Sequence, residues 1–398
     1  MVRPARVLSL YEGFFAGGAR VLHTEVVAGL HRSGEQAHSV LSIAARVRRE
    51  STVQHLGDDA RYQRLAAAGV AVDTLGREAD AAPMGPDSFT EAEIAVAARA
   101  VRDADLILSL KEQPLGILLA LHARGLMPDI PVAACLHRSD PLHSGPALGW
   151  LVEAAASGLV TATISCARTT DEAYHRAGVS AASRFVIPNG VDTALYRPGT
   201  AGERAATRTL LGIPSHAPVV VFAARFDAMK NPGLFLRAVA RHVAVAPGAH
   251  YVLCGAGMTR DNDGFRALAE ESGLRESRAV HALGIRRDMP SIYQIADIVA
   301  LTSAFGEASP LCLLEGAACG ATPVTTDVGD AAAQVDGFGV VTPANEDAIA
   351  EAWRSVVTRR RVHRARALAA RSGIDRERML QAYADASFSL LRRQEAAA

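Results

Sequence analysis

Short apolar runs alternate with longer amphipathic stretches along the whole chain. In the first half, apolar runs of strand length cover residues 6–11, 38–43, 70–75, 105–110, 131–137 and 161–166. Stretches with helical spacing lie between them, at residues 19–34, 90–104, 114–125 and 148–158. Such alternation is typical of βαβ units that build a parallel sheet. The pattern therefore predicts an α/β protein.

The alternation restarts after a turn-rich stretch, IPNGVDTALYRPG, at residues 187–199. Further apolar runs follow at residues 218–224, 250–257, 279–284, 297–303, 322–326 and 339–343. We therefore expect two Rossmann-like, doubly wound domains, at residues 1–188 and 189–374, with a last helix near 375–398 that packs back on the first. Their parallel sheets would face each other across a cleft, where ligands of such folds bind.

Composition and charge exclude several classes of protein. The 398 residues contain 42 Lys and Arg against 42 Asp and Glu, and the one basic run, from Arg359 to Arg366, is typical of a solvated helix face. Nucleic-acid binding is therefore not expected. No uncharged apolar stretch reaches about 18 residues, so no transmembrane helix is predicted, and the first residues resemble a strand rather than a signal peptide. Five cysteines without a CxxC pair indicate buried thiols in a cytoplasmic protein.

The stretch FGEASPLCLLEGAACG places Glu307 and Glu315 eight positions apart. Ser309 is expected to cap a helix, with Pro310 at its first position and Gly320 at its end. The two carboxylates would then flank a helix N-terminus, which attracts phosphate. That arrangement suits a nucleotide-sugar, which has hydroxyls on both sides of its diphosphate. One helix-start acid plus one exposed helical acid is the alternative interpretation.

Arg225 and Lys230 follow an apolar strand in VVVFAARFDAMKNP. Two cations in one strand-end loop are suited to neutralise a diphosphate leaving group. Only Lys111 and Lys230 are lysines in this chain, which favours a need for a compact ammonium at these positions over a pair of ordinary surface cations. The alternative explanation is that lysine occurs at these two positions by chance.

Two further motifs lie in the first half. In YEGFFAGGARVLH, Gly17 and Gly18 open a helix and allow the main chain to approach a phosphate or sugar. In CLHRSDPLH, His137 follows a strand, with Asp140 and His143 nearby. This spacing matches no standard metal-ligand set, so a hydrogen-bonding histidine is the preferred interpretation and a satisfied loop histidine the alternative.

Together these motifs resemble the retaining glycosyltransferases of family GT4, which have the GT-B fold. The E-x7-E pair carries the resemblance most strongly, supported by AARFDAMKN, CGAGM, ALGIRRDMPSIYQIADIVALTSAFGE, GAACGATPVTTDVGD and IPNGVD. The resemblance spans nearly the whole chain, and the order and spacing of the motifs make it specific.

The resemblance implies roles for individual residues. Glu307 would bind donor-sugar hydroxyls, Glu315 the ribose, and Arg225 with Lys230 the diphosphate. The remaining implied contacts are Leu311 and Cys312 at the helix start, Gly17 and Gly18 at the donor phosphate, His137 at the donor sugar, and Ile285 with Arg286 at the base. Arg138 departs from the family's usual sequence after the histidine.

The resemblance also implies the reaction. A hexose-type sugar would move, with retention at the anomeric carbon, from a nucleotide diphosphate sugar to an acceptor hydroxyl, with neither a metal nor another cofactor. UDP is favoured over GDP as the nucleotide. Asp261-Asn262-Asp263 mimics a metal-binding DxD but is interpreted as a solvated loop. A small soluble acceptor is favoured, as in the secondary metabolism of high-GC bacteria, over a membrane-linked glycan, and a homodimer is compatible with the sequence.

Other classes of function are weighed against this one. Nucleotide-sugar 2-epimerases also use two Rossmann-like domains. A dehydrogenase would require GxGxxG after the first strand and an acid after the second, and EGFFAGGA and HSVLSIAA lack both. A non-catalytic sugar-binding protein is disfavoured by the intact set of charged residues.

Overall fold

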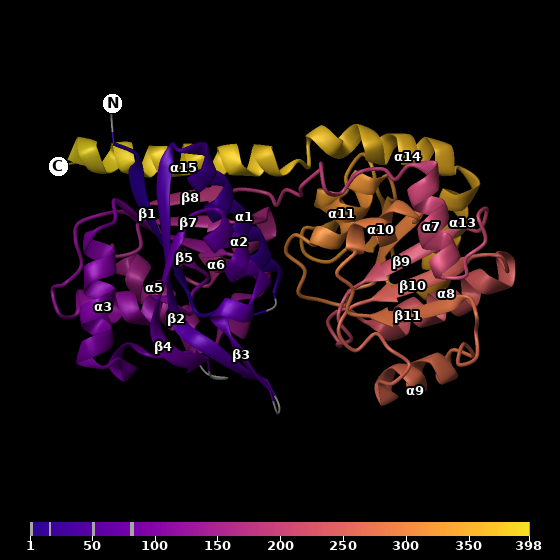
Figure 1. The fold of residues 1–398 in the computed structure, drawn as a ribbon, viewed down its shortest axis with the longest axis horizontal. Helices are drawn as coiled ribbons and strands as arrows, with labels where there is room; N and C mark the ends of the chain where they lie inside the picture. The colour runs from indigo at the N-terminus through magenta and orange to yellow at the C-terminus, as the bar shows by residue number, and fades with distance from the viewer. Residues whose placement is uncertain (1–2, 16, 50–51, 80–82, 398) are drawn as a thin grey trace. The chain divides into compact units, whose positions relative to one another are not determined.

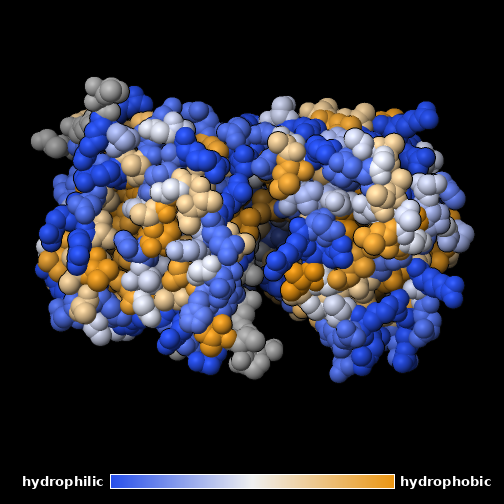
Figure 2. All heavy atoms as spheres, viewed as in Figure 1, coloured by the Kyte–Doolittle hydropathy of each residue, from blue (hydrophilic) through white to orange (hydrophobic). Residues whose placement is uncertain are grey.

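The computed structural model describes residues 3–15, 17–49, 52–79 and 83–397, which form two compact units (Figure 1). Unit 1 comprises residues 1–188 and 379–398, and unit 2 comprises residues 189–378. Hydrophilic side chains cover much of the face of each unit drawn in Figure 2, with apolar residues interspersed. Within the described residues, no helix combines the length and apolarity that crossing a membrane requires.

Unit 1 is built on an eight-stranded sheet with the order β3-β2-β1-β5-β6-β7-β8, in which β4 also pairs with β2. The pairs are parallel except β2 with β3. The strands are β1 (Ala5–Tyr11), β2 (Gln36–Arg49), β3 (Thr52–His55), β4 (Ala71–Ala79), β5 (Leu106–Leu110), β6 (Val132–Leu136), β7 (Ala162–Ser165) and β8 (Ser183–Val186).

Helices connect these strands and cover the sheet. They are α1 (Gly18–Ser33), α2 (Ala60–Ala67), α3 (Glu91–Arg102), α4 (Leu115–His122), α5 (Pro146–Ala156) and α6 (Arg168–Arg176), with the 3-10 turns η1 (Leu56–Asp58), η2 (Pro86–Ser88) and η3 (Pro141–Ser144). The C-terminal helix α15 (Arg376–Ala397) packs on α1, where Gly29 leaves room for Leu380: a Cβ at Gly29 would lie 2.5 Å from a Leu380 methyl. Strands β5, β6 and β7 are buried at every position, as expected of central strands in a parallel sheet.

Unit 2 is built on a six-stranded, fully parallel sheet with the order β11-β10-β9-β12-β13-β14. Its strands are β9 (Val219–Ala223), β10 (His250–Cys254), β11 (Val280–Gly284), β12 (Ile298–Leu301), β13 (Thr322–Thr326) and β14 (Val340–Thr342). Its helices are α7 (Ala201–Leu210), α8 (Pro232–Val245), α9 (Asp263–Glu271), α10 (Met289–Gln294), α11 (Leu311–Cys319), α12 (Ala331–Gln334), α13 (Glu346–Thr358) and α14 (Arg360–Ala369), followed by the 3-10 turn η4 (Ala370–Ser372).

Each face of the unit 2 sheet is covered by a separate apolar cluster. One cluster joins Val219 and Val221 to α10 and α11, and the other joins Val220 and Phe222 to α8 and α13. Alternate residues of β9 thus enter opposite clusters, which is the arrangement of a doubly wound sheet. Two parallel-sheet α/β units of this kind confirm the predicted GT-B fold class.

The apolar runs predicted the parallel strands well but missed β3 and β8. Strand β3 pairs with the polar outer end of β2, where Arg46 and Arg48 both contact Glu78, so apolar content did not mark it. The cysteines are all buried except Cys312, which is half-buried.

Candidate active site

Five loops of unit 2 meet at the carboxyl edge of its sheet. Because parallel strands all end at the same edge, the loops after β9, β10, β11, β12 and β13 lie together there. Gly255 allows the closest approach between two of them: its Cβ would lie 2.0 Å from the carbonyl oxygen of Ala224. The residues predicted to bind a donor in the second half lie on these loops and on the first turns of α11.

Lys230 and Glu307 form an ion pair at this edge. Lys230 Nζ lies 2.5 Å from Glu307 Oε1, and the Ser303 hydroxyl donates to the same oxygen. The side chains are 15% and 5% exposed, respectively, so water screens the pair weakly. Both hydrogen bonds described for this carboxylate fall on Oε1, and Oε2 is therefore the oxygen available to a ligand hydroxyl. The structure thus brings together two predicted residues that are 77 positions apart in sequence.

The main chain around this pair is fixed from both sides. The Thr302 hydroxyl donates to the carbonyl oxygens of Lys230 and Asn231, at 3.3 and 3.1 Å, and Ala304 N donates to Met229 O at 2.9 Å. Asn231 adopts a left-handed conformation (φ 50°) and caps α8 through its side chain. These contacts hold the two loops together and thereby set the direction of the lysine.

Glycine at position 329 is required directly behind Glu307. A Cβ at Gly329, whose φ is +60°, would lie 1.7 Å from the carbonyl oxygen of Glu307. Any larger residue would therefore displace the loop that carries the carboxylate.

Arg225 is the more exposed of the two predicted cations. Its side chain is 59% exposed, and its guanidinium pairs with Asp227, whose other oxygen accepts from Lys230 N at 3.0 Å. Asp227 therefore positions both cations. Sequence reasoning quoted the FDAMKN stretch but did not assign a role to this aspartate.

The helix start between the two glutamates differs from the prediction by one residue. Pro310, with φ −69° and ψ 111°, is the extended residue before the helix, and α11 begins at Leu311. The prediction of Ser309 as cap and Pro310 as first helical residue was wrong, because the Ser309 hydroxyl instead accepts from Gln334 Nε2 at 2.8 Å. No side chain caps the helix, so Leu311 and Cys312 present its first backbone N–H groups. Gly320 ends the helix in a left-handed conformation, as predicted.

Glu315 lies about one turn along the same helix, in an aromatic environment. Burial raises the pKa of its carboxyl above the usual range, and the hydroxyls of Tyr293 and Tyr196 oppose this change. Cys312 lies between the two glutamates: burial raises its thiol pKa to about 12, and both carboxylates act in the same direction. Neither tyrosine was predicted, although Tyr293 lies in a motif that carried the resemblance and Tyr196 in the linker stretch at residues 187–199.

Ile285 and Arg286 follow β11 in a neighbouring loop. Ile285 is 76% exposed, which is unusual for so large an apolar side chain, whereas Arg286 pairs with Asp288 at 2.6 Å. An exposed aliphatic surface beside a held guanidinium is suited to a flat heterocyclic base.

Unit 1 has its own group of charged residues at the carboxyl ends of β1, β5 and β6. Helix α1 begins at Gly18, with Gly17 before it, as predicted. Arg20 in its first turn is almost fully buried, donates to Gly13 O at 2.8 Å and pairs with Glu12 at 2.8 Å. Burial lowers the pKa of Arg20 to about 10, and Glu12 opposes this decrease.

His137 and Lys111 lie close together in this group. Burial and the charge of Lys111 lower the pKa of His137 to about 3, so the imidazole is neutral at physiological pH. Its Nε2 is buried and has no hydrogen-bond partner within the described part of the chain. Lys111 adopts a left-handed conformation (φ 68°). Burial and the charges of Arg138 and Arg20 lower its pKa to about 8. Sequence reasoning singled out His137, and noted Lys111 only through the rarity of lysine.

The remaining motif residues have structural partners. Glu112 is fully buried and accepts from Ser144 at 2.9 Å, while His143 pairs with Asp140 at 3.0 Å on the surface. Asn262 caps α9, and Asp263, the first residue of that helix, pairs with Arg266, so the DND stretch is a turn that leads into a helix. Among the residues placed by the structure, no three His, Cys, Asp or Glu side chains gather as metal ligands would.

Comparison with known proteins points to one family for unit 2. Residues 217–359 match the family described as glycosyl transferases group 1. A D-inositol 3-phosphate glycosyltransferase of Corynebacterium aurimucosum is 34% identical over 172 residues, which are 42% of this chain and 40% of that protein. One of Saccharomonospora viridis is 34% identical over 189 residues, 45% and 42% of the two chains. The chain thus matches less than half the length of these relatives.

Solved structures match nearly the whole chain. HepE of Anabaena in complex with UDP has a TM-score of 0.79 at 22% identity, covering 97% of this chain and 100% of that one. Sucrose-phosphate synthase of Thermosynechococcus elongatus has a TM-score of 0.68 at 18% identity, covering 99% and 100%. At these identities, the similarity shows a common fold.

Proposed function

We propose that this protein is a retaining glycosyltransferase that moves a hexose-type sugar from a nucleotide diphosphate sugar to a small acceptor. The observation that carries the proposal is the buried Lys230–Glu307 pair beside the uncapped N-terminus of α11. A diphosphate needs cations and N–H donors, and a sugar needs a carboxylate for its hydroxyls, and this edge provides both. The group 1 match over residues 217–359 supports the same function.

Lys230, Arg225 and the N–H groups of Leu311 and Cys312 would stabilise the departing diphosphate without a metal. Negative charge grows on the leaving oxygen as the bond to the anomeric carbon breaks, and fixed donors favour that charge. The acceptor hydroxyl would attack from the face that the leaving group vacates, and its proton would pass to the departing phosphate oxygen. Glu307 would orient the sugar and would not act as a nucleophile.

The donor is proposed to be a UDP-sugar. HepE was solved with UDP-glucose as well as with UDP, at TM-scores of 0.77 and 0.79 to this chain. Ile285 would cover the base, and Glu315 would bind the ribose hydroxyls. GDP is the alternative nucleotide.

The acceptor is proposed to be small and to carry an anionic group. Lys111 and Arg138 repel each other, and the structure gives Lys111 no ion pair with any residue it places. An acceptor phosphate or carboxylate would relieve that repulsion. Relatives named as D-inositol 3-phosphate glycosyltransferases are consistent with a phosphorylated acceptor. His137, held neutral, would face sugar hydroxyls.

The test measures thermal stabilisation by UDP, GDP, ADP and TDP and their sugar conjugates, with and without magnesium, followed by product analysis. We expect a selective, metal-independent increase in Tm with UDP and UDP-hexose, because a ligand that binds only the folded state stabilises it. NMR of the product anomeric proton would then show retention. Absence of any nucleotide-dependent shift would overturn the proposal, and sugar conversion without an acceptor would indicate a 2-epimerase.

A further inference from the structure

A second cationic site lies within unit 2, at the opposite edge of its sheet from Lys230 and Glu307. Asp297 precedes β12, and its main chain bonds to Val219 and Thr322, the first residues of β9 and β13. The site is therefore at the amino edge of the sheet. A strand of five residues separates the two edges by roughly 15 Å.

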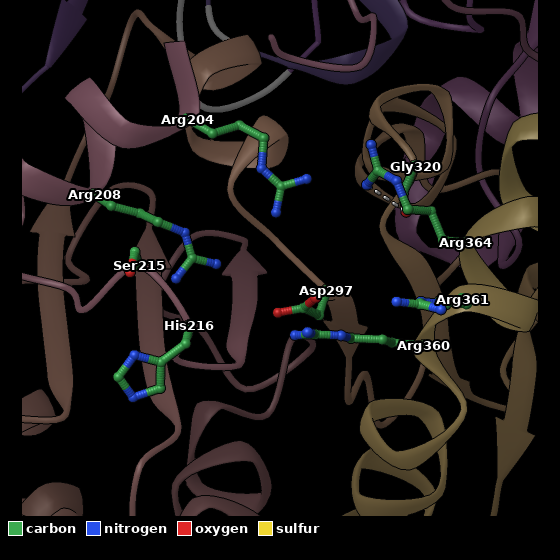
Figure 3. A pocket seen from close by; sticks show the side chains of 9 residues that line it. All are labelled: Arg204, Arg208, Ser215, His216, Asp297, Gly320, Arg360, Arg361 and Arg364. Atoms are coloured by element: carbon green, nitrogen blue, oxygen red, sulfur yellow. Dashed lines mark hydrogen bonds between the residues drawn. The ribbon is translucent and has the colours of Figure 1, made fainter. Parts of the chain in front are cut away.

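A cavity of about 210 Å³ opens at this edge, and five guanidinium groups surround it (Figure 3). Two come from α7 and three from α14, which places them on both sides of Asp297 in the view of Figure 3. The five are Arg204, Arg208, Arg360, Arg361 and Arg364. Asp297 is the one carboxylate among the residues that line the cavity.

The excess of positive charge is local. The chain as a whole has equal numbers of acidic and basic residues, and exposed arginines on neighbouring elements are paired, as Arg354 is with Glu351 and Arg197 with Glu203. Within the described structure, none of the five arginines around the cavity forms an ion pair. Asp297 itself accepts a hydrogen bond from Val219 N at 2.9 Å, so one of its carboxylate oxygens already has a partner in the main chain.

The positive charge of each arginine disfavours protonation of its neighbours. Burial lowers the pKa of Arg208; the charge of Asp297 opposes this decrease, and the charges of Arg204 and Arg360 add to it. Burial also lowers the pKa of Arg364, again with a contribution from Arg204. Like charges that face one another in a partly enclosed space destabilise the fold unless an anion joins them.

Arg208 and Gly320 help to fix the arginines around the cavity. Arg208 is 5% exposed, and its terminal nitrogens donate to the carbonyl oxygens of Pro214, Ala217 and Ile295. Its Nε is buried and has no hydrogen-bond partner among the residues that the structure describes. Gly320 has no side chain where Arg364 crosses it: a Cβ there would lie 2.9 Å from the guanidinium carbon. The site is therefore built into the packing of α7, α11 and α14.

We propose that this cavity binds a small anion with two or more phosphate charges, at a site separate from the proposed donor site. Planar guanidinium groups match phosphate oxygens in pairs, which favours phosphate over a single carboxylate. The cavity is smaller than the roughly 300–1,000 Å³ usual for drug-sized ligands, so a diphosphate or a small bisphosphate fits the volume better than a complete nucleotide-sugar. Binding there would stabilise unit 2 independently of glycosyl transfer, and the proposal does not rest on the proposed function.

The test is isothermal titration with pyrophosphate, without divalent metal, in a protein carrying Arg225→Ala and Lys230→Ala so that the first site does not contribute. We expect binding in this background, at least tenfold weaker after Arg360→Gln and Arg364→Gln are added. The matched control adds Arg359→Gln and Arg366→Gln, which remove the same charge from exposed positions at the same helix, and binding should persist.

Two further readouts separate binding from folding defects. The unliganded Arg360→Gln, Arg364→Gln protein should melt at the same temperature as its parent or slightly above, because repulsion is reduced. Affinity for pyrophosphate should fall as salt is raised. No binding in the parent background, or binding that survives the Arg360 and Arg364 changes, would overturn the proposal.

Discussion

The two lysines of this chain lie in similar places and in opposite electrostatic surroundings. Each follows a central strand of its unit: Lys111 comes directly after β5, and Lys230 lies in the loop after β9. Lys230 is paired with Glu307, whereas Lys111 has Arg138 as its main charged neighbour. A paired ammonium is oriented before any ligand arrives. An unpaired buried one destabilises the unit until an anion binds.

A lysine can therefore serve in two ways: held in place by a carboxylate before the ligand binds, or left without such a partner so that it attracts an anionic ligand. At the Lys230 edge the protein holds the cation for a charge that develops during reaction, which favours the transition state. At Lys111 the repulsion from Arg138 and Arg20 is only partly offset by Glu112 and Glu12, which favours a ligand that is anionic from the start.

Lys230→Ala should produce the largest effect. It removes the cation proposed to stabilise the leaving diphosphate and leaves Glu307 buried without its partner, so we expect kcat to fall by about 10²–10³-fold, as for loss of one oxyanion donor. Steady-state kinetics with UDP-hexose would measure this fall, and circular dichroism would verify folding. Turnover close to wild type would contradict the proposed role.

Lys111→Met should instead affect the acceptor. We expect its KM for an anionic acceptor to rise by about 10–100-fold, because a charge-assisted contact is lost, while the KM for the donor stays unchanged. Lys111→Arg is the matched control and should retain part of the affinity. An equal loss with a neutral acceptor would show that Lys111 acts on something other than acceptor charge.

The pH dependence of stability should reveal Lys111 directly. Its pKa is about 8 in the folded protein against the ordinary lysine value of 10.5, so between these pH values the unfolded chain binds a proton that the folded chain lacks. The free energy of unfolding should therefore gain about 1–3 kcal/mol from this group as pH rises from about 8 to about 10.5. Urea titrations of the wild type and Lys111→Met at pH 7.5 and 10 measure this gain; identical pH slopes in both proteins would contradict it.

Arg225→Ala should have the smallest effect on the reaction. The side chain is 59% exposed and already paired with Asp227, so its loss should raise the KM for the donor about tenfold and change kcat less than Lys230→Ala does. A fall in kcat equal to that of Lys230→Ala would show that the two cations act as one unit.

Much of the fold followed from apolar runs, because buried parallel strands are nearly continuous in hydrophobic residues. Such runs located β5, β6, β9 and β12. Strand β3 is polar and contains no such run, so it was missed. The E-x7-E pair and the two cations of RFDAMKN were found because charged residues at strand ends stand out. Contacts between segments apart in sequence were not predictable: the Lys230–Glu307 pair spans 77 positions, and Gly329 lies directly behind Glu307 without any local signal. Ser309 looked like a cap, but a glutamine from α12 occupies its hydroxyl.

The buried thiols have a practical consequence for chemical labelling. Burial raises the pKa of Cys135, Cys254, Cys312 and Cys319 to about 12, and Cys166 is 3% exposed. Alkylating reagents attack the thiolate, so the native cysteines should react slowly at neutral pH. A single cysteine introduced on the surface of either unit would then carry a fluorophore selectively, with no need to remove the native five first.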